Sequence, residues 1–289
     1  MKILLTGKTG QVGWELERSL QALGEVVAVD RQQMDLSDLD QVRDVVRRVR
    51  PNLIVNPAAY TAVDKAESEP AMAMRINGEA PAVMAEEAKK LGAGMIHYST
   101  DYVFDGSKEG PYTESDPVCP VNVYGATKLA GEQAIQAAGI PHLILRTSWV
   151  YGARGKNFLL TVLRLAQERD ELRIVSDQFG SPTWCRTIAD TTAQIIAKLD
   201  WFDPAGKCAQ AASGIVHLTC QGRTSWHGFT EAIVQHHSVA RKPLVTPIRT
   251  EQYPLPAKRP ANSELSCERL KSMGIHLPDW QTALRLCQD

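Results

Sequence analysis

The fold that we expect is decided by the stretch Ile3-Leu4-Leu5-Thr6-Gly7-Lys8-Thr9-Gly10-Gln11-Val12-Gly13. Its apolar start predicts a strand buried on both faces, and its three glycines predict a sharp turn into a helix. Gly7 permits the tight turn, Gly10 lets a pyrophosphate approach bare backbone, and Gly13 lets the helix pack close to the strand. The first amides of that helix would then hold the phosphates.

Length and composition exclude several classes of protein. The chain has 289 residues, of which 44% are hydrophobic, and a formal net charge of -1. Its length allows two lobes, and its near-neutral charge argues against a nucleic-acid partner. We see no apolar run long enough for a signal-peptide core or a bilayer span, so we expect no membrane association and a cytoplasmic protein. The six cysteines form no CxxC pair, which argues against a zinc site or a disulfide framework and predicts no metal ligands.

Apolar strands alternate with helical patterns along the first half. We expect strands over 25–30, 53–56, 95–99 and 142–146, with helices between them. This alternation predicts an α/β fold, a Rossmann-type doubly wound parallel sheet with a smaller C-terminal substrate lobe. Residues 1–149 would form the dinucleotide-binding domain, and residues 150–289 would form mainly the substrate-binding lobe, with one segment returning to the sheet.

The ends of the second and third strands carry the next signals. Asp30 ends the second strand and Arg31 follows it. An acid at this place bonds the adenosine ribose, whereas an arginine accommodates a 2′-phosphate, so both NADH and NADPH remain compatible with the sequence. The small residues of 56–61 would let backbone approach a ligand at the carboxyl edge of the sheet.

Three residues predict proton-transfer chemistry. Tyr124 and Lys128 are four apart on one predicted helix, so their side chains share a face. A nearby ammonium favours the tyrosinate, so we expect Lys128 to bring the pKa of Tyr124 toward the working range. Thr100 ends the fourth strand and could bond the same substrate oxygen. The loop over 105–120 is rich in Gly, Pro, Ser and acids, and we expect it to lie over the site.

Several longer motifs carry a resemblance to a known family. They are Gly7 to Glu15, Thr61 to Glu67, His97 to Phe104, Asn122 to Gly125, Arg146 to Tyr151 and Asp177 to Gly180. Together they resemble the extended short-chain dehydrogenase/reductase superfamily, and more narrowly the dTDP-4-dehydrorhamnose reductases. The resemblance covers nearly the whole chain. It implies that NAD(P)H delivers hydride to C4 of a dTDP-4-dehydro-L-rhamnose substrate.

The same resemblance implies a set of binding residues. Cofactor contacts would come from Gly7, Gly10, Gln11, Val12, Gly13, Asp30, Arg31, Asp35, Leu36, Ala59, Tyr60, Thr61, Tyr124 and Lys128. Substrate contacts would come from Thr100, Asp101, Tyr102, Trp149, Arg259 and Asn262. The implied catalytic residues are Thr100, Tyr124 and Lys128.

Some relatives are described as homodimers that share Mg²⁺ between acidic side chains. Glu15 matches one such position, but Arg186 stands where the family often has an acid. A cation there would repel the metal, which argues against Mg²⁺ in this chain, while a homodimer remains compatible.

Two alternatives stay open. In the related dehydratases a glutamate follows the Thr-Asp pair, whereas Tyr102 follows Asp101 here, so elimination is disfavoured and epimerisation is not. The other alternative is a non-catalytic NAD(P)-binding regulatory subunit, since fold alone does not fix function. The intact set of Thr100, Tyr124 and Lys128 favours catalysis.

Overall fold

A sheet of parallel strands in the order β10-β5-β4-β3-β1-β2 organises the computed structural model, which describes residues 1–199, 213–237 and 242–287. The strands are β1 (Lys2–Leu5), β2 (Glu25–Ala28), β3 (Leu53–Asn56), β4 (Gly94–Thr100), β5 (His142–Thr147) and β10 (Gly214–His217). The order reverses direction between β1 and β3, which is where ligands bind in open α/β sheets. The parallel α/β sheet predicted from the sequence is confirmed.

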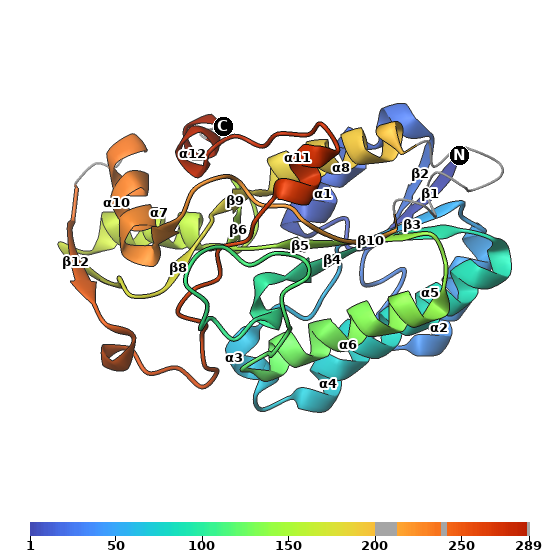
Figure 1. The fold of residues 1–289 in the computed structure, drawn as a ribbon, viewed down its shortest axis with the longest axis horizontal. Helices are drawn as coiled ribbons and strands as arrows, with labels where there is room; N and C mark the ends of the chain where they lie inside the picture. The colour runs from blue at the N-terminus through green and yellow to red at the C-terminus, as the bar shows by residue number, and fades with distance from the viewer. Residues whose placement is uncertain (200–212, 238–241, 288–289) are drawn as a thin grey trace.

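Helices cover both faces of this sheet (Figure 1). One face packs on α1 (Gln11–Ser19), α8 (Cys185–Lys198) and α11 (Glu268–Ser272), and the other on α2 (Leu39–Val49), α5 (Ala80–Leu91) and α6 (Val123–Ala138). Each face buries its own apolar cluster, with Leu16, Ile188 and Leu270 in the first and Val42, Met84 and Ile135 in the second. Two buried faces explain why the strands read as continuous apolar runs.

Local signals in the sequence set several helix ends. The side chain of Asp38 accepts a hydrogen bond from the Gln41 amide at the start of α2, and Asn122 caps α6 in the same way through Gly125. Such caps satisfy amides that the first helical turn leaves unpaired. α1 begins at Gln11, earlier than the apolar spacing indicates, and a 3-10 turn, η1 (Gln21–Leu23), follows it.

The helical stretch over 70–91 has a wide turn in its middle. α4 (Pro70–Met74) continues through a π turn, η2 (Arg75–Glu79), into α5, and the short α3 (Val63–Ala66) precedes it. Gly131 of α6 packs against this turn so closely that a Cβ there would lie 2.2 Å from the Asn77 carbonyl oxygen. The glycine therefore allows α6 to lie against η2.

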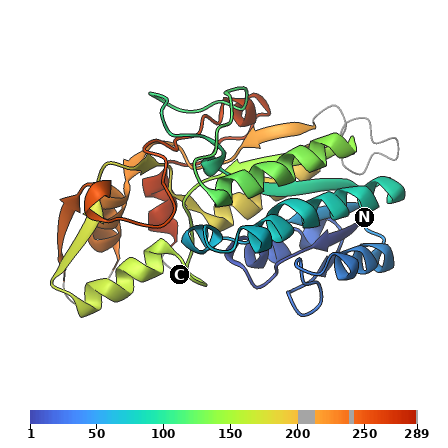
Figure 2. The same ribbon diagram turned by 90° about the horizontal axis from the view of Figure 1, so that it is seen from below.

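The smaller lobe lies to one side of the sheet (Figure 2). It contains β6 (Val150–Tyr151), α7 (Phe158–Glu168), β7 (Glu171–Val175), β8 (Phe179–Gly180), β9 (Thr183–Trp184), β11 (Thr224–Ser225), α10 (Trp226–His236), β12 (Leu244–Ile248), η4 (Thr250–Gln252) and α12 (Trp280–Leu286). A separate apolar cluster that includes Phe229, Ile233 and Trp280 forms its core. β10 leaves this half of the chain and pairs in parallel with β5.

Within 1–199, 213–237 and 242–287, none of the helices is long and apolar enough to cross a bilayer. The cysteines in these ranges, Cys119, Cys185, Cys220, Cys267 and Cys287, are free thiols. The sixth, Cys208, lies outside the described residues.

Candidate active site

The glycine loop makes the tight turn that its sequence predicts. Gly7 has φ of 60°, a left-handed conformation that side chains rarely adopt, and a Cβ on Gly13 would lie 2.0 Å from the Gly7 carbonyl oxygen. Among the described residues, no side chain caps the start of α1. The first amides of α1 are therefore available to a ligand, and Gly10 and Gln11 line a surface pocket of about 450 Å³ with Lys8 and Arg154.

Asp30 pairs with Lys8 of the glycine loop. Its Oδ2 lies 3.5 Å from the Lys8 ammonium, which also donates a 2.7 Å hydrogen bond to Gln33. Arg31 is exposed and donates to Asp35 at 3.2 Å. The sequence prediction places Leu36 near the adenine, and the structure buries its side chain in the core under α2. Because Asp30 lies just after the end of β2 with Lys8 and Arg31 nearby, both NADH and NADPH remain compatible with this part of the site.

The turn after β3 is fixed by Asn77. Its side chain accepts from the Tyr60 amide at 2.8 Å and donates to the Tyr60 carbonyl at 3.1 Å, while its Nδ2 also reaches the Thr127 hydroxyl. Ala59 and Tyr60 are partly exposed and Thr61 is exposed, so this backbone lies open beside the glycine loop. η2 and α6 thus support the segment that would follow a bound cofactor.

Thr100 and Asp101 lie buried at the end of β4. The Thr100 hydroxyl donates to Asp101 Oδ1 at 2.9 Å and accepts from the Tyr102 amide at 3.1 Å. Burial raises the pKa of Asp101 to about 6, although the hydroxyls of Ser263 and Thr100 act in the opposite direction. Asp101 therefore carries a carboxylate that its surroundings only partly stabilise.

Tyr124 stands beside Thr100 and Tyr102. Its ring meets the Tyr102 ring edge to face, with centroids 5.9 Å apart. Burial, and then the charge of Asp101, raise the pKa of Tyr124 to about 12, whereas the Thr100 hydroxyl lowers it. The expectation that Lys128 brings this pKa toward neutrality is wrong, because desolvation of the phenol and the charge of Asp101 raise it.

Lys128 is buried behind Tyr124 on the same helix. Its Nζ donates to the Tyr98 carbonyl at 2.6 Å and lies 3.1 Å from His97 Nε2. Burial lowers the pKa of Lys128 to about 8, and the charge of Glu132 acts against this shift. The lysine is therefore an ammonium at neutral pH that loses its proton within the range of ordinary assays.

Trp149 occupies the entrance to the smaller lobe. It has φ of 47°, unusual for a residue with a side chain, and its indole stacks on Trp226 with centroids 3.5 Å apart. Gly180 packs directly against this indole, since a Cβ on Gly180 would lie 2.5 Å from the Trp149 ring. The indole is thus held rigidly, and it stays partly exposed at the junction of the lobes.

Arg259 joins the late block of the chain to the first half. Its guanidinium makes two hydrogen bonds to Asp64 of α3, at 2.6 and 2.8 Å, and it holds the pKa of that carboxyl below its usual value. The Ala257 amide also donates to Asp64. This paired geometry ties residues 257–259 to the segment that follows the β3 turn.

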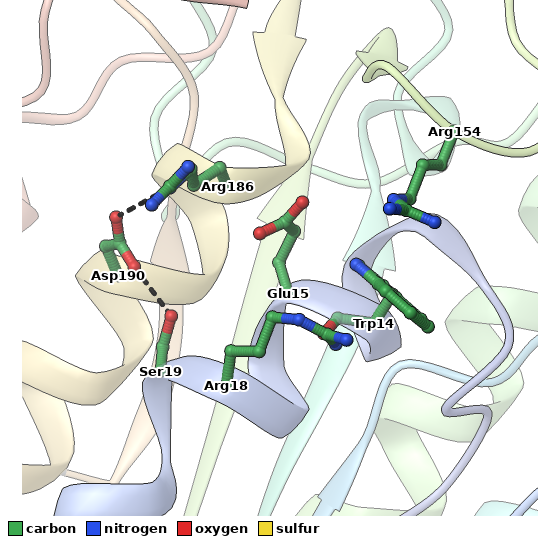
Figure 3. Close-up of a pocket in the computed structure, with 7 residues that line it drawn as sticks. All are labelled: Trp14, Glu15, Arg18, Ser19, Arg154, Arg186 and Asp190. Atoms are coloured by element: carbon green, nitrogen blue, oxygen red, sulfur yellow. Dashed lines mark hydrogen bonds and ion pairs between the residues drawn. The ribbon is translucent and has the colours of Figure 1, made fainter. Parts of the chain in front are cut away.

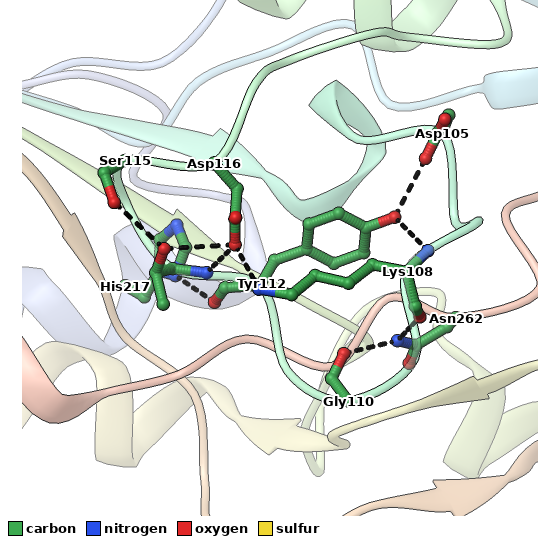
Figure 4. Close-up of polar contacts among 9 residues, drawn as sticks. Asp105, Lys108, Gly110, Tyr112, Ser115, Asp116, His217 and Asn262 are labelled. Atoms are coloured by element: carbon green, nitrogen blue, oxygen red, sulfur yellow. Dashed lines mark hydrogen bonds and ion pairs between the residues drawn. The ribbon is translucent and has the colours of Figure 1, made fainter.

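Asn262 holds the 105–120 loop in place (Figure 4). Its buried amide donates to the carbonyls of Lys108 and Gly110 at 2.9 and 2.8 Å. Tyr112 adds a hydrogen bond to Asp105, and Lys108 pairs with Asp116. Since both donor bonds of Asn262 go to this loop, its direct contribution is to position the loop.

A family model described as the RmlD substrate binding domain matches residues 1–289. The chain belongs to this family. It is 53% identical over 294 residues to the dTDP-4-dehydrorhamnose reductase of Burkholderia thailandensis, with 99% of this chain and 98% of that protein covered.

Two further similar proteins carry the same name as the Burkholderia thailandensis relative. The dTDP-4-dehydrorhamnose reductase of Escherichia coli K12 is 46% identical over 99% of this chain and 96% of that protein. The solved dTDP-4-dehydrorhamnose reductase of Bacillus anthracis, in complex with NADP, has a TM-score of 0.88 and 34% identity, with 99% and 98% of the two chains covered. The family predicted from the sequence motifs is confirmed.

Glu15, the residue considered above for Mg²⁺, is surrounded by cationic side chains. Glu15 lies in a surface pocket with Arg18, Arg154 and Arg186 (Figure 3), and Arg186 faces Asp190 at 4.0 Å. In the part of the chain that the structure describes, no group of three or more His, Cys, Asp or Glu side chains could hold a metal ion. The surrounding guanidinium groups compete with a divalent cation for the carboxylates.

Gly13→Ala tests the glycine loop of this family member. The new Cβ would overlap the Gly7 carbonyl, so α1 must move and we expect NADPH affinity to fall at least about tenfold, together with a lower unfolding temperature. Fluorescence titration and thermal unfolding measure the two effects. In Gly10→Ala the nearest atom lies 3.3 Å away, so its unfolding temperature should stay near that of the wild type. Equal stability of Gly13→Ala and wild type would contradict the account.

Asp101→Asn tests the buried carboxylate. Because the pKa of Asp101 rises from 3.8 to about 6 on folding, its charge destabilises the folded protein increasingly as pH rises through that window. We expect the variant to match the wild type near pH 4 and to be more stable at pH 8, by about 3 kcal/mol. Chemical unfolding at both pH values measures this. Asp105→Asn is the control with the opposite sign, because hydrogen bonds from Ser107 lower the pKa of Asp105.

Sequence reasoning gave no role to two residues of the site. His97 contacts Lys128, and Asn56 contacts His97 at 3.0 Å, both fully buried. The available signal was a polar residue inside each of two apolar strands, 53–56 and 94–100, which alone does not tell a core hydrogen bond from a functional one.

Proposed function

We propose that the protein is an NAD(P)H-dependent reductase that converts dTDP-4-dehydro-L-rhamnose to dTDP-L-rhamnose, a step of nucleotide-sugar and cell-surface polysaccharide biosynthesis. One observation carries the proposal: Thr100 at the end of β4 adjoins the Tyr124 phenol of α6, and Lys128 follows one turn later on the same helix. The chain matches reductases of this name over nearly its whole length. When bound, the nicotinamide cofactor supplies the hydride.

Tyr124 acts as the proton donor in this proposal. With a pKa of about 12 the phenol keeps its proton throughout the assay range, so the acid form required for transfer to a ketone oxygen is always present. Thr100 adjoins Tyr124 and orients the same oxygen. Tyr102, where a dehydratase would carry a glutamate, presents a phenol ring to Tyr124 and offers no second carboxylate for elimination.

The cofactor and substrate residues are proposed as follows. Gly7 to Gly13 bind the pyrophosphate, Asp30, Arg31 and Asp35 bind the adenosine end, and Ala59, Tyr60, Thr61 and Lys128 bind along the nicotinamide half. Asp101, Tyr102 and Trp149 face the sugar. Arg259 and Asn262 support this side by fixing α3 and the 105–120 loop, as their hydrogen bonds indicate.

We also propose which half of the chain binds which ligand, how the protein assembles and where it is located in the cell. Residues 1–149, with β10, bind the dinucleotide, and residues 150–289 supply mainly the substrate side. We propose a homodimer, which light scattering of the purified protein tests directly. A cytoplasmic location suits an enzyme whose cofactor and nucleotide-sugar substrate are both water-soluble.

An absorbance assay of nicotinamide oxidation tests the function. We expect NADPH and NADH to be oxidised when dTDP-4-dehydro-L-rhamnose is supplied, with dTDP-L-rhamnose as the product, and no oxidation without the sugar. Isomerised sugar without loss of absorbance would favour an epimerase. Cofactor binding without any turnover of the sugar would favour a regulatory subunit.

A further inference from the structure

A buried chain of hydrogen bonds leads from the glycine loop to Lys128. The Thr6 hydroxyl donates to Asn56 Oδ1 at 2.6 Å, and Asn56 Nδ2 lies 3.0 Å from His97 Nδ1. His97 Nε2 in turn lies 3.1 Å from Lys128 Nζ. The chain crosses β3 and β4, and it joins the residue after β1 to the middle of α6.

The chain fixes the tautomer of His97. An amide nitrogen can only donate, so Nδ1 of His97 accepts from Asn56 and carries no proton. Burial and the charge of Lys128 lower the pKa of His97 well below its usual value, so the ring is neutral. A neutral ring that accepts at Nδ1 carries its proton on Nε2. That N–H points at the lysine nitrogen.

Two donors cannot bond each other, so this geometry discriminates between the two forms of Lys128. The neutral amine offers a lone pair to the His97 N–H, whereas the ammonium offers only further N–H groups. We propose that His97 is a positioning residue, which orients Lys128 through this donated hydrogen bond and favours release of the lysine proton. The proposal deepens the proposed function, since it rests there on Lys128 as a cofactor ligand.

Other charged groups around Lys128 do not explain this preference. Glu132, one turn along α6, stabilises the ammonium and is itself paired with Arg146 of β5. Asp101 on η3 (Asp101–Val103) is a further acid on an element packed against α6, and its carboxylate accepts from the Thr100 hydroxyl. Most charged groups of α3, η2 and α5 are paired with partners other than Lys128. The pairs are Asp64 with Arg259, Lys65 with Glu69, Arg75 with Glu79, and Glu87 with Arg47 and Lys90. Glu86 and Lys89 are exposed at the surface.

The functional consequence concerns the pH range of the enzyme. A lysine in water keeps its proton to about pH 10. Burial lowers the pKa of Lys128 to about 8, within a range where a proton can pass to and from the site during turnover, and the hydrogen bond from His97 would act in the same direction. His97 would thereby make Lys128 a group that exchanges its proton readily beside Tyr124.

The titration of Lys128 in the protein without ligands tests this. Lysine labelled with ¹³C at Cε reports its own protonation by NMR, and the Lys128→Met variant identifies the signal. We expect a midpoint near pH 8 in the wild type and an upward shift of about one pH unit in His97→Leu, which removes the donor. His97→Gln can still donate from its amide, so its midpoint should return toward that of the wild type.

His217→Leu is the matched control. His217 is also fully buried, on β10, and bonds the Tyr112 carbonyl rather than Lys128. It should lose stability without moving the Lys128 midpoint. An unchanged or lower midpoint in His97→Leu, or an equal shift in His217→Leu, would overturn the proposal.

NADPH affinity measured across the same pH range separates this inference from the proposed function. If the affinity follows the Lys128 midpoint in both wild type and His97→Leu, both stand. If the NMR midpoint shifts and the affinity does not follow it, His97 keeps its role and the cofactor role of Lys128 fails.

Discussion

Tyr124→Phe is expected to lower kcat by about 10²–10⁴-fold while leaving NADPH affinity within about twofold of the wild type. The substitution removes only the hydroxyl, and the ring keeps its edge-to-face contact with Tyr102. Steady-state kinetics with dTDP-4-dehydro-L-rhamnose and fluorescence titration of the cofactor measure the two quantities.

Tyr102→Phe is the matched control for this experiment. It deletes a phenol hydroxyl from the adjacent ring, on the substrate side of the proposed site, so we expect mainly a higher KM for the sugar. If Tyr124→Phe retained wild-type turnover, or if both variants lost turnover equally, Tyr124 would not be the proton donor. The alkaline limb of the wild-type profile should follow Lys128, with its pKa of about 8, rather than Tyr124.

Glu132→Ala is expected to destabilise the protein by about 3–5 kcal/mol. Glu132 and Arg146 join α6 to β5 through two hydrogen bonds of 2.9 and 2.6 Å, and both side chains are at most 2% exposed. Removing the acid leaves the guanidinium buried without its counter-charge. Chemical unfolding gives the free energy difference.

Glu168→Ala provides the comparison on the surface. Its carboxylate pairs with Arg164 on α7, with the two side chains 51% and 60% exposed, so we expect a change below about 0.5 kcal/mol. Replacing Glu132 and Arg146 together by Leu and Met should recover much of the loss, because no lone charge remains. Similar effects for the buried and the exposed acid would refute this assignment.

Patterns close in sequence were enough to predict the central sheet. The glycine loop and the apolar strands each depend on neighbouring residues, so their interpretation needed no tertiary contacts. The smaller lobe was harder. Its strands are two to five residues long and pair across large gaps, as β8 does with β11, and such pairing has no local signature.

Within the candidate site, the residue types were predictable and their electrostatics were not. The YxxxK spacing placed Tyr124 and Lys128 on one helix, but the pKa of Tyr124 depends on how deeply the phenol is buried and on the charge of Asp101. Both follow from the packing of η3 against α6, which no sequence motif describes. His97 escaped notice for the same reason, since its partner is 31 positions away.

The membership of β10 in the main sheet bears on how this protein must be made. While a nascent chain has emerged only as far as β5, the backbone of His142–Thr147 has a free edge, because its outer neighbour is not yet synthesised. Free edges of apolar strands recruit strands from other molecules. A fragment cut after residue 149 would keep the glycine loop together with this unpaired strand edge, so we expect it to aggregate unless the segment that contains β10 is included.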